Sequence, residues 1–123
     1  MAEHNDFGTL AENLAAEYLQ KKNYKILARN YRFQKAEIDI IADFNGLTVV
    51  AEVKARSYNT IIEPQEAVTK KKIKSIVQCA DFFMQENNLS TEVRFDIITV
   101  LPDKTGILQI EHIEDAFQSF DAN

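Results

Sequence analysis

The chain has 123 residues, long enough for one compact hydrophobic core and too short for two, so we expect a single domain over residues 1–123. Hydrophobic residues make up 46% and charged residues 27%, a globular composition that excludes wholesale disorder and a disulfide scaffold. With 14 basic and 19 acidic side chains the net charge is −5, which excludes a protein that coats nucleic acid by electrostatics alone.

The N-terminal half of the chain predicts one helix followed by three strands. Apolar residues recur at helical spacing from Phe7 to Leu19, which predicts an amphipathic helix from about residue 7 to the polar stop at 21–23. Segments rich in aromatic and aliphatic residues follow, and the dipeptide Asn45-Gly46 separates the last two of them. We predict strands over 24–33, 37–43 and 47–56.

The C-terminal half predicts a second helix and a second hairpin. An apolar stripe predicts a helix over about 69–87, with Thr69 as its N-cap and Cys79 as a buried, inert thiol. We predict further strands over 93–101 and 107–113, and a short terminal helix over 114–120. The resulting order, α-β-β-β-α-β-β with a helical crossover, predicts an α/β fold whose central mixed five-stranded sheet is flanked by helices.

The first hairpin concentrates polar side chains on one face. Asn45-Gly46 favours a two-residue type I′ turn, and counting outward from that turn places Asp39 opposite Glu52. Period-two alternation puts the polar residues on one face and the apolar residues between them, Ile38 and Ile40 included, on the other. The polar face consists of Glu37, Asp39, Glu52 and Lys54.

Two facing carboxylates indicate a cation site. Side chains opposed across an antiparallel pair have Cβ atoms roughly 4.5–5.5 Å apart, and like charges there are destabilising unless something offsets them. Mg²⁺ or Mn²⁺ suits a pair of carboxylates with one backbone carbonyl, because water and phosphate oxygens complete the shell. We therefore expect Asp39, Glu52 and the carbonyl of Val53 as ligands. Lys54 would orient or deprotonate an attacking water or stabilise developing charge.

The same polar pattern has a second interpretation. Asp/Glu-x-Lys triplets are common by chance, so the hairpin is also compatible with a solvated face on which Glu37 and Lys54 form a cross-strand pair.

A local group of basic residues is the part of the chain suited to phosphate. A run of lysines is also typical of a solvated helix face, and both interpretations stay open. The group consists of Arg29, Arg32, Arg56, Lys70, Lys71, Lys72 and Lys74.

Several stretches, in chain order, carry a family resemblance. AEIDIIA at 36–42, followed by EVKAR at 52–56, resembles the paired motifs of the YraN-like family, small bacterial proteins assigned to the restriction-endonuclease-like, PD-(D/E)xK nuclease superfamily. The family often has glycine where this chain has Ala11 and Ala36. Further matching landmarks are AE at 11–12, ARNYR at 28–32, PQEAV at 64–68, RFD at 94–96 and HIEDAF at 112–117.

The resemblance implies a restriction-endonuclease-like core in which Asp39, Glu52 and Lys54 form the metal-dependent catalytic site. The superfamily often adds a glutamate from the first helix, which would be Glu12. An alternative explanation for Glu12 is a T-x-x-E capping box starting at Thr9, or a place on the exposed flank.

Two residues after the third strand have similarly open roles. Gln65 or Glu66 either approaches the site from that loop or complements the dipole at the start of the second helix.

The leading hypothesis is a Mg²⁺- or Mn²⁺-dependent endonuclease acting on DNA, on branched or processed intermediates rather than on a fixed sequence. The competing hypothesis is a nucleic-acid-binding or protein-binding module that keeps the nuclease fold without turnover, and a structural subunit of a larger assembly is a third. A homodimer is suggested by analogy with other nucleases. No apolar run approaches the roughly 20 residues that span a bilayer, and no secretion signal opens the chain, so we expect a cytoplasmic protein with no membrane partner.

Overall fold

The computed structural model describes residues 3–58 and 69–122. Its strands form one five-stranded sheet in the order β1-β2-β3-β4-β5. All neighbours are antiparallel except β3 and β4, which are parallel at the centre, so the predicted mixed sheet is confirmed. The elements are α1 (Glu3–Lys21), β1 (Lys25–Phe33), β2 (Ala36–Phe44), β3 (Leu47–Ala55), α2 (Lys70–Glu86), β4 (Val93–Pro102), β5 (Leu108–Phe117) and the short 3-10 helix η2 (Ser119–Ala122).

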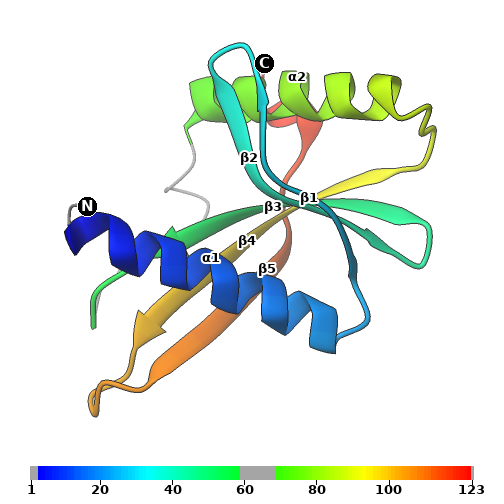
Figure 1. The fold of residues 1–123 in the computed structure, drawn as a ribbon. Coiled ribbons are helices and arrows are strands. Elements are labelled where there is room, and N and C mark those ends of the chain that lie inside the picture. The colour runs from blue at the N-terminus through cyan, green and yellow to red at the C-terminus, as the bar shows by residue number, and fades with distance from the viewer. Residues whose placement is uncertain (1–2, 59–68, 123) are drawn as a thin grey trace.

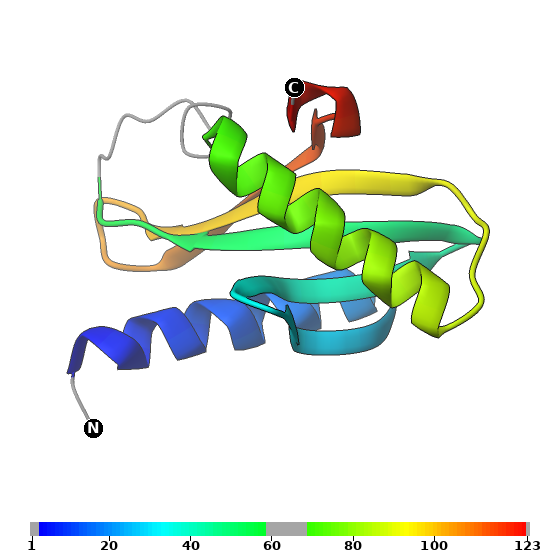
Figure 2. The same cartoon turned by 90° about the horizontal axis from the view of Figure 1, so that it is seen from above.

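The two helices cover different faces of the sheet (Figure 1). Alternation along β3 explains this arrangement, since Val49 packs with Leu19 of α1 while Val50 packs with Ile76 of α2. The sheet therefore lies between two layers, one with α1 and one with α2 (Figure 2). Both layers include fully buried β3 residues. Neither helix of the described residues is long and apolar enough to cross a membrane. Cys79 is buried in the α2 layer, as predicted.

The predicted hairpin turn is confirmed. Asn45 and Gly46 have φ of 52° and 88°, the two positive values that a type I′ turn requires. Antiparallel pairing starts at Phe44 with Leu47 and keeps the predicted register as far as the pair Ile40–Ala51.

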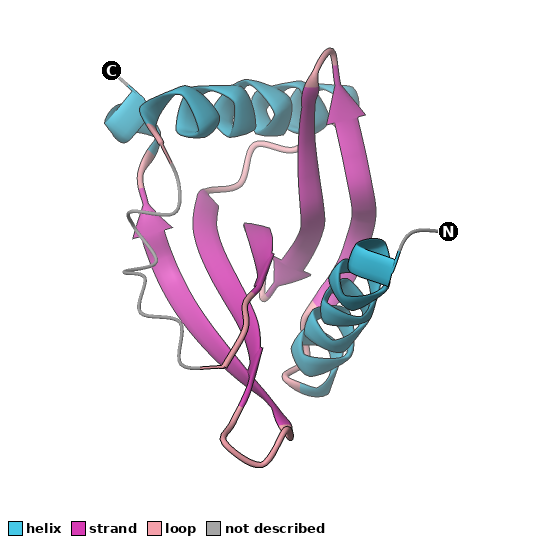
Figure 3. Ribbon diagram, turned by 90° about the vertical axis from the view of Figure 1, so that its left-hand side faces the viewer, coloured by secondary structure: helices cyan, strands magenta, loops and turns pink. Residues whose placement is uncertain are grey.

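The β1–β2 hairpin contacts both helices. Arg29 donates to Asn13 of α1 at 2.8 Å, whereas the Tyr31 hydroxyl donates to Glu86 of α2 at 2.9 Å. Asn30, between these two residues, has a φ of 52°, which reverses the direction of the side chains that follow it. The turn of this hairpin consequently lies beside α2 (Figure 3).

Two sequence predictions about helices are wrong. Helix α1 begins at Glu3, earlier than predicted, so Thr9 lies inside the helix and cannot open a capping box. Residues 114–117, predicted as helix, continue strand β5, and only Ser119–Ala122 turn helically. Pairing with β4 overrides the local helical pattern, because Phe117 is buried and its ring stacks on Phe95 with centroids 5.2 Å apart.

Candidate metal centre

The candidate site lies where β2 and β3 separate. Their antiparallel ladder ends at Ile40–Ala51, one residue short of the predicted pair between Asp39 and Glu52. Asp39 is bound to β3 in another way, because its Oδ2 accepts a hydrogen bond from the Val53 amide at 2.8 Å.

The predicted alternation of β2 fails at the same place. Ile40 packs on the α1 side of the sheet, while Ile38 packs on the α2 side. The two isoleucines were predicted on one face, and the structure corrects this. The reason is that β2, no longer paired with β3, twists through Asp39 as it follows β1 toward α2.

Glu52 lies on β3 directly beyond the end of that ladder, while β3 stays paired with β4. Its side chain is 3% exposed, and Oε1 lies 3.6 Å from Nζ of Lys72 on α2. The other oxygen, Oε2, is buried and has no hydrogen-bond partner. Such burial excludes a solvated hairpin face as the explanation for Glu52, and an unpartnered buried carboxylate oxygen is energetically costly.

The environment of Asp39 and Glu52 disfavours the ionised form of both carboxyl groups. Burial raises the pKa of Glu52 to about 7, and the Asp39 carboxylate adds to the effect. Burial also raises the pKa of Asp39, despite the hydrogen bond from the Val53 amide and the charge of Lys54. Neighbouring acids with raised pKa values in a buried setting are typical of functional sites.

Lys54 brings an amine to the same cluster. Burial lowers the pKa of Lys54, although the negative charges of Glu52 and Asp39 act in the opposite direction. A lysine with a lowered pKa releases its proton more readily than an ordinary lysine, so it is better suited to proton transfer.

Glu12 of α1 approaches the same centre. Burial raises the pKa of Glu12, and the Asp39 and Glu37 carboxylates raise it further. Asn30 links the acids: with its amide nitrogen turned toward them, it donates to Glu12 Oε1 at 3.0 Å and to Glu37 Oε2 at 3.3 Å. Sequence reasoning missed Asn30, whose only signal was its place in the ARNYR segment at 28–32.

The remaining predicted residues take other positions. Glu37 forms its ion pair with Arg32 on β1 at 2.8 Å, so the predicted cross-strand pair of Glu37 with Lys54 is not formed. Lys72, predicted for phosphate, instead contacts Glu52. Gln65 and Glu66 lie outside the described residues. Arg56 is half-buried and donates to the Ala55 carbonyl, Arg29 is exposed beside α1, and Lys70, Lys71 and Lys74 are exposed on α2.

A divalent cation at this site would need ligands other than carboxylates, such as water molecules, to complete its coordination. Among residues 3–58 and 69–122, no three His, Cys, Asp or Glu side chains converge to hold a metal by themselves. Mg²⁺ characteristically takes one or two carboxylates and keeps several waters. The unpartnered Oε2 of Glu52 and the neighbouring Asp39 carboxylate suit that pattern.

A second buried polar network was missed by sequence reasoning. Asp96 on β4 is fully buried, and its carboxylate accepts two hydrogen bonds from Arg94, at 2.8 and 2.9 Å. It also accepts a hydrogen bond from the Asp115 amide at 3.0 Å, and its Oδ2 lies 2.7 Å from Nε2 of His112. Arg94 also donates to the Tyr24 hydroxyl at 2.7 Å. These contacts join β4, β5 and the connection between α1 and β1, so the network is structural.

Comparison with known proteins points to one family. The model of the Uncharacterised protein family UPF0102 matches residues 11–100, which include both candidate carboxylates. UPF0102 proteins of Christiangramia forsetii and Flavobacterium psychrophilum are each 48% identical over 98% of this chain and 100% of their own length. A UPF0102 protein of Phocaeicola vulgatus is 44% identical over 95% of this chain and 96% of its own length. The chain therefore belongs to the uncharacterised protein family UPF0102, which is the YraN-like family that its motifs predicted.

Proposed function

We propose that this protein is a Mg²⁺- or Mn²⁺-dependent endonuclease that hydrolyses phosphodiester bonds in DNA. The observation that supports this most strongly is Glu52, whose buried Oε2 has no partner and whose carboxyl group neighbours that of Asp39. A site of this kind gains stability when a cation arrives, because the cation removes both the repulsion and the unsatisfied oxygen.

Each polar group has a distinct role in this proposal. Asp39 and Glu52 would hold the ion, with the Val53 carbonyl, waters and phosphate oxygens as further ligands. When bound, a divalent ion lowers the pKa of a coordinated water and polarises a phosphoryl oxygen. Lys54, with its lowered pKa, accepts a proton at Nζ from the attacking water or stabilises negative charge on the phosphate. Glu12 orients water on the α1 side.

The proposed substrate class follows from the cations around the site. Exposed lysines on α2 and exposed arginines on β1 suit phosphate contacts, which position a duplex but read no sequence. We therefore propose selection by DNA structure, such as branches or processed ends, rather than by base sequence.

A cleavage assay tests the activity. Flapped, branched, single-stranded and duplex DNAs are incubated with Mg²⁺ or Mn²⁺ and the wild-type protein, Asp39→Ala or Asp43→Ala. The proposal expects cleavage of at least one structured DNA, loss of a hundredfold or more in Asp39→Ala, and little change in Asp43→Ala, which lies on the same strand. Equal cleavage by wild type and Asp39→Ala would assign the activity to another site or to a contaminant.

Calorimetry tests the metal site without knowledge of the substrate. Mn²⁺ should bind the wild-type protein and should bind Asp39→Asn and Glu52→Gln at least tenfold more weakly, because each variant removes one anionic ligand. Identical isotherms for the three proteins would reject Asp39 and Glu52 as ligands.

A binding module without turnover is the second candidate. It is favoured by the absence, among the described residues, of three converging acidic, His or Cys side chains. This candidate expects DNA binding that is unaffected by Mn²⁺ and by Glu52→Gln, together with no cleavage of any DNA in the panel.

A further inference from the structure

Two pockets lie between the turn of the β1–β2 hairpin and α2. The inner pocket, of about 180 Å³, is lined by residues 35–37 of the hairpin and by Lys72, Ser75 and Ile76. It adjoins the candidate metal centre, because Lys72 contacts Glu52 and Glu37 shares Asn30 with Glu12.

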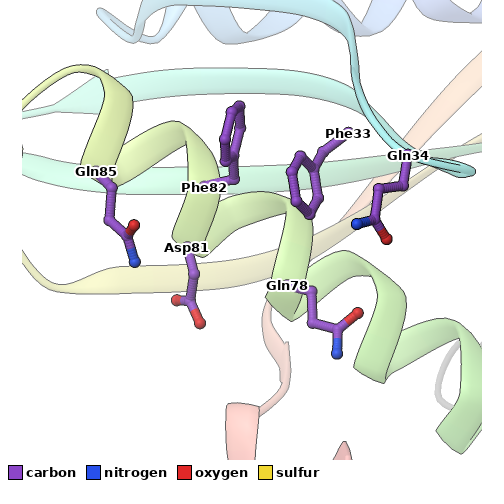
Figure 4. Close-up of a pocket in the computed structure, with 6 residues that line it drawn as sticks. All are labelled: Phe33, Gln34, Gln78, Asp81, Phe82 and Gln85. Atoms are coloured by element: carbon purple, nitrogen blue, oxygen red, sulfur yellow. The ribbon is translucent and has the colours of Figure 1, made fainter.

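The outer pocket, of about 340 Å³, continues along the same two walls. It is lined by the hairpin residues that precede those of the inner pocket and by the following turns of α2. Ser75 of the inner pocket and Phe82 of the outer pocket are seven residues apart, so they lie on the same side of the helix. The outer pocket is lined by Phe33, Gln34, Gln78, Asp81, Phe82 and Gln85 (Figure 4).

The outer pocket combines an aromatic wall with amide groups. The rings of Phe33 and Phe82 are stacked with centroids 4.2 Å apart, and Phe82 remains 37% exposed. Three glutamine amides offer both donors and acceptors, and Asp81 offers an acceptor only. Asp81 would repel a phosphate, and the six lining residues include no lysine or arginine.

We infer that the outer pocket binds an unpaired nucleobase of the strand whose phosphate lies at the metal centre. An aromatic wall with amides around it recognises a base by stacking and by hydrogen bonds to its edge. Charge along α2 is divided accordingly: Lys70, Lys71, Lys72 and Lys74 occupy its first turns, and the outer pocket occupies its later ones. Phosphate thus meets the basic end of the helix and a base meets the aromatic end.

The spacing along α2 suits a single strand. From Lys72 to Phe82 the helix rises roughly 15 Å, which is at most about four nucleotides at the stacked spacing of roughly 3.4 Å. A base that remains paired cannot insert its face and edge into such a pocket. This inference rests on the proposed function and gives it a physical basis for preferring flapped or frayed DNA.

The test measures binding alone, in EDTA, so that it does not depend on cleavage. Fluorescein-labelled oligothymidylate of twelve nucleotides is compared with a fully abasic strand of the same length, by fluorescence anisotropy. The variants are Phe82→Leu, which keeps an apolar contact to Phe33, Phe82→Tyr, which keeps an aromatic face, and Ile107→Ala. Ile107 is 63% exposed and precedes β5, away from α2, so Ile107→Ala is the matched control.

The wild-type protein is expected to bind oligothymidylate about tenfold or more tightly than the abasic strand, in line with base–aromatic stacking. Phe82→Leu should lose that preference and keep the affinity for the abasic strand, while Phe82→Tyr and Ile107→Ala should keep the preference. Unfolding curves that match the wild-type curve show that Phe82→Leu is folded.

Equal binding of the two strands by the wild-type protein, or an unchanged preference in Phe82→Leu, would overturn the inference and leave the pocket to a side chain of a protein partner. Asp39→Ala, measured in the same binding assay, separates the base pocket from the proposed function, because this variant should lose cleavage and keep the base preference. A base preference without cleavage by any of these proteins would reject the nuclease and retain the base pocket.

Discussion

Glu52 is a buried acid for which the protonated form is favoured below about pH 7. Its folded-state pKa of about 7 lies above the ordinary value of 4.5, because burial and the Asp39 carboxylate both oppose ionisation. Between these two pH values the folded protein holds a proton that the unfolded chain has released. The stability that this proton contributes is present at low pH and is lost as pH rises through 7.

Glu52→Gln should therefore stabilise the metal-free protein in a pH-dependent way. The shift in pKa corresponds to roughly 3 kcal/mol, so the variant should gain up to about that amount over wild type at pH 8 and less than about 1 kcal/mol at pH 5. Urea unfolding at the two pH values measures the difference. Glu111→Gln, an exposed position on β5, is the matched control and should show no such pH dependence. A loss of stability in Glu52→Gln that is equal at both pH values would contradict this account.

At the scale of elements, α2 connects the candidate metal centre with the outer pocket. Its start is determined by Thr69, which has extended backbone angles and accepts a hydrogen bond from the Lys72 amide at 3.1 Å. The same residue, Lys72, extends its side chain to Glu52. The N-cap therefore orders the turn of α2 that reaches the candidate metal centre.

Thr69→Ala should destabilise the protein by about 1 kcal/mol, the usual cost of removing an N-cap hydroxyl. Thr69→Ser keeps the hydroxyl and should remain close to wild type. Chemical unfolding of the three proteins measures the effect, and a stability of Thr69→Ala equal to that of Thr69→Ser would exclude a role for the cap.

At the scale of the whole molecule, the Asp96 network joins elements that are far apart in the sequence. Burial alone would raise the pKa of Asp96, but hydrogen bonds from His112, Arg94 and the Asp115 amide outweigh burial and lower it. The folded state thus binds its proton less tightly than the unfolded chain does. The stability contributed by ionised Asp96 is present above the ordinary pKa of 3.8 and is lost as pH falls through the folded-state value.

Asp96→Asn should cost roughly 3–5 kcal/mol at pH 7, because it removes the buried counterion of Arg94 and leaves only the exposed Glu114, whose Oε1 lies 3.4 Å from Arg94. The difference from wild type should shrink as the pH falls below 3.8. Denaturant unfolding across this range measures it. Asp103→Asn is the control, since Asp103 also accepts several hydrogen bonds but lies in an exposed turn, and its loss should be much smaller. This assignment would be contradicted if Asp103→Asn, and not Asp96→Asn, lost much stability and did so equally at every pH.

With a net charge of −5, the proposed binding of DNA requires a local group of cations. Replacing Lys70, Lys71, Lys72 and Lys74 with glutamine should weaken DNA binding and flatten its salt dependence, by about 0.9 in the log–log slope for each phosphate that is no longer neutralised. Anisotropy titrations over a range of salt concentrations measure the slope. A matched quadruple replacement uses the exposed Lys21, Lys22, Lys25 and Lys104. Equal slopes for the two quadruple variants would assign the α2 lysines to a merely solvated face.

The sequence by itself determined the features that depend on neighbouring residues. Element order follows from hydrophobic periodicity, the type I′ turn from Asn45-Gly46, and the helix start from Thr69, because each signal acts on backbone angles within a few residues. The hairpin register was predictable as far as Ile40–Ala51 for the same reason. The family was predictable as well, since its motifs can be compared position by position.

Only the tertiary structure decided the features that depend on packing between distant segments. Residues 114–117 form strand because they pair with the edge of β4, and the local sequence pattern carries no information about that edge. The burial of Glu52 and the approach of Lys72 require α2 to pack on β3, and the bridge from Asn30 to Glu12 requires α1 and β1 to meet. Spacing along the chain reports which face a side chain takes only while the strand stays regular, and it failed at Ile38, where β2 leaves β3. Burial and partners arise from contacts that form only when the whole sheet is assembled.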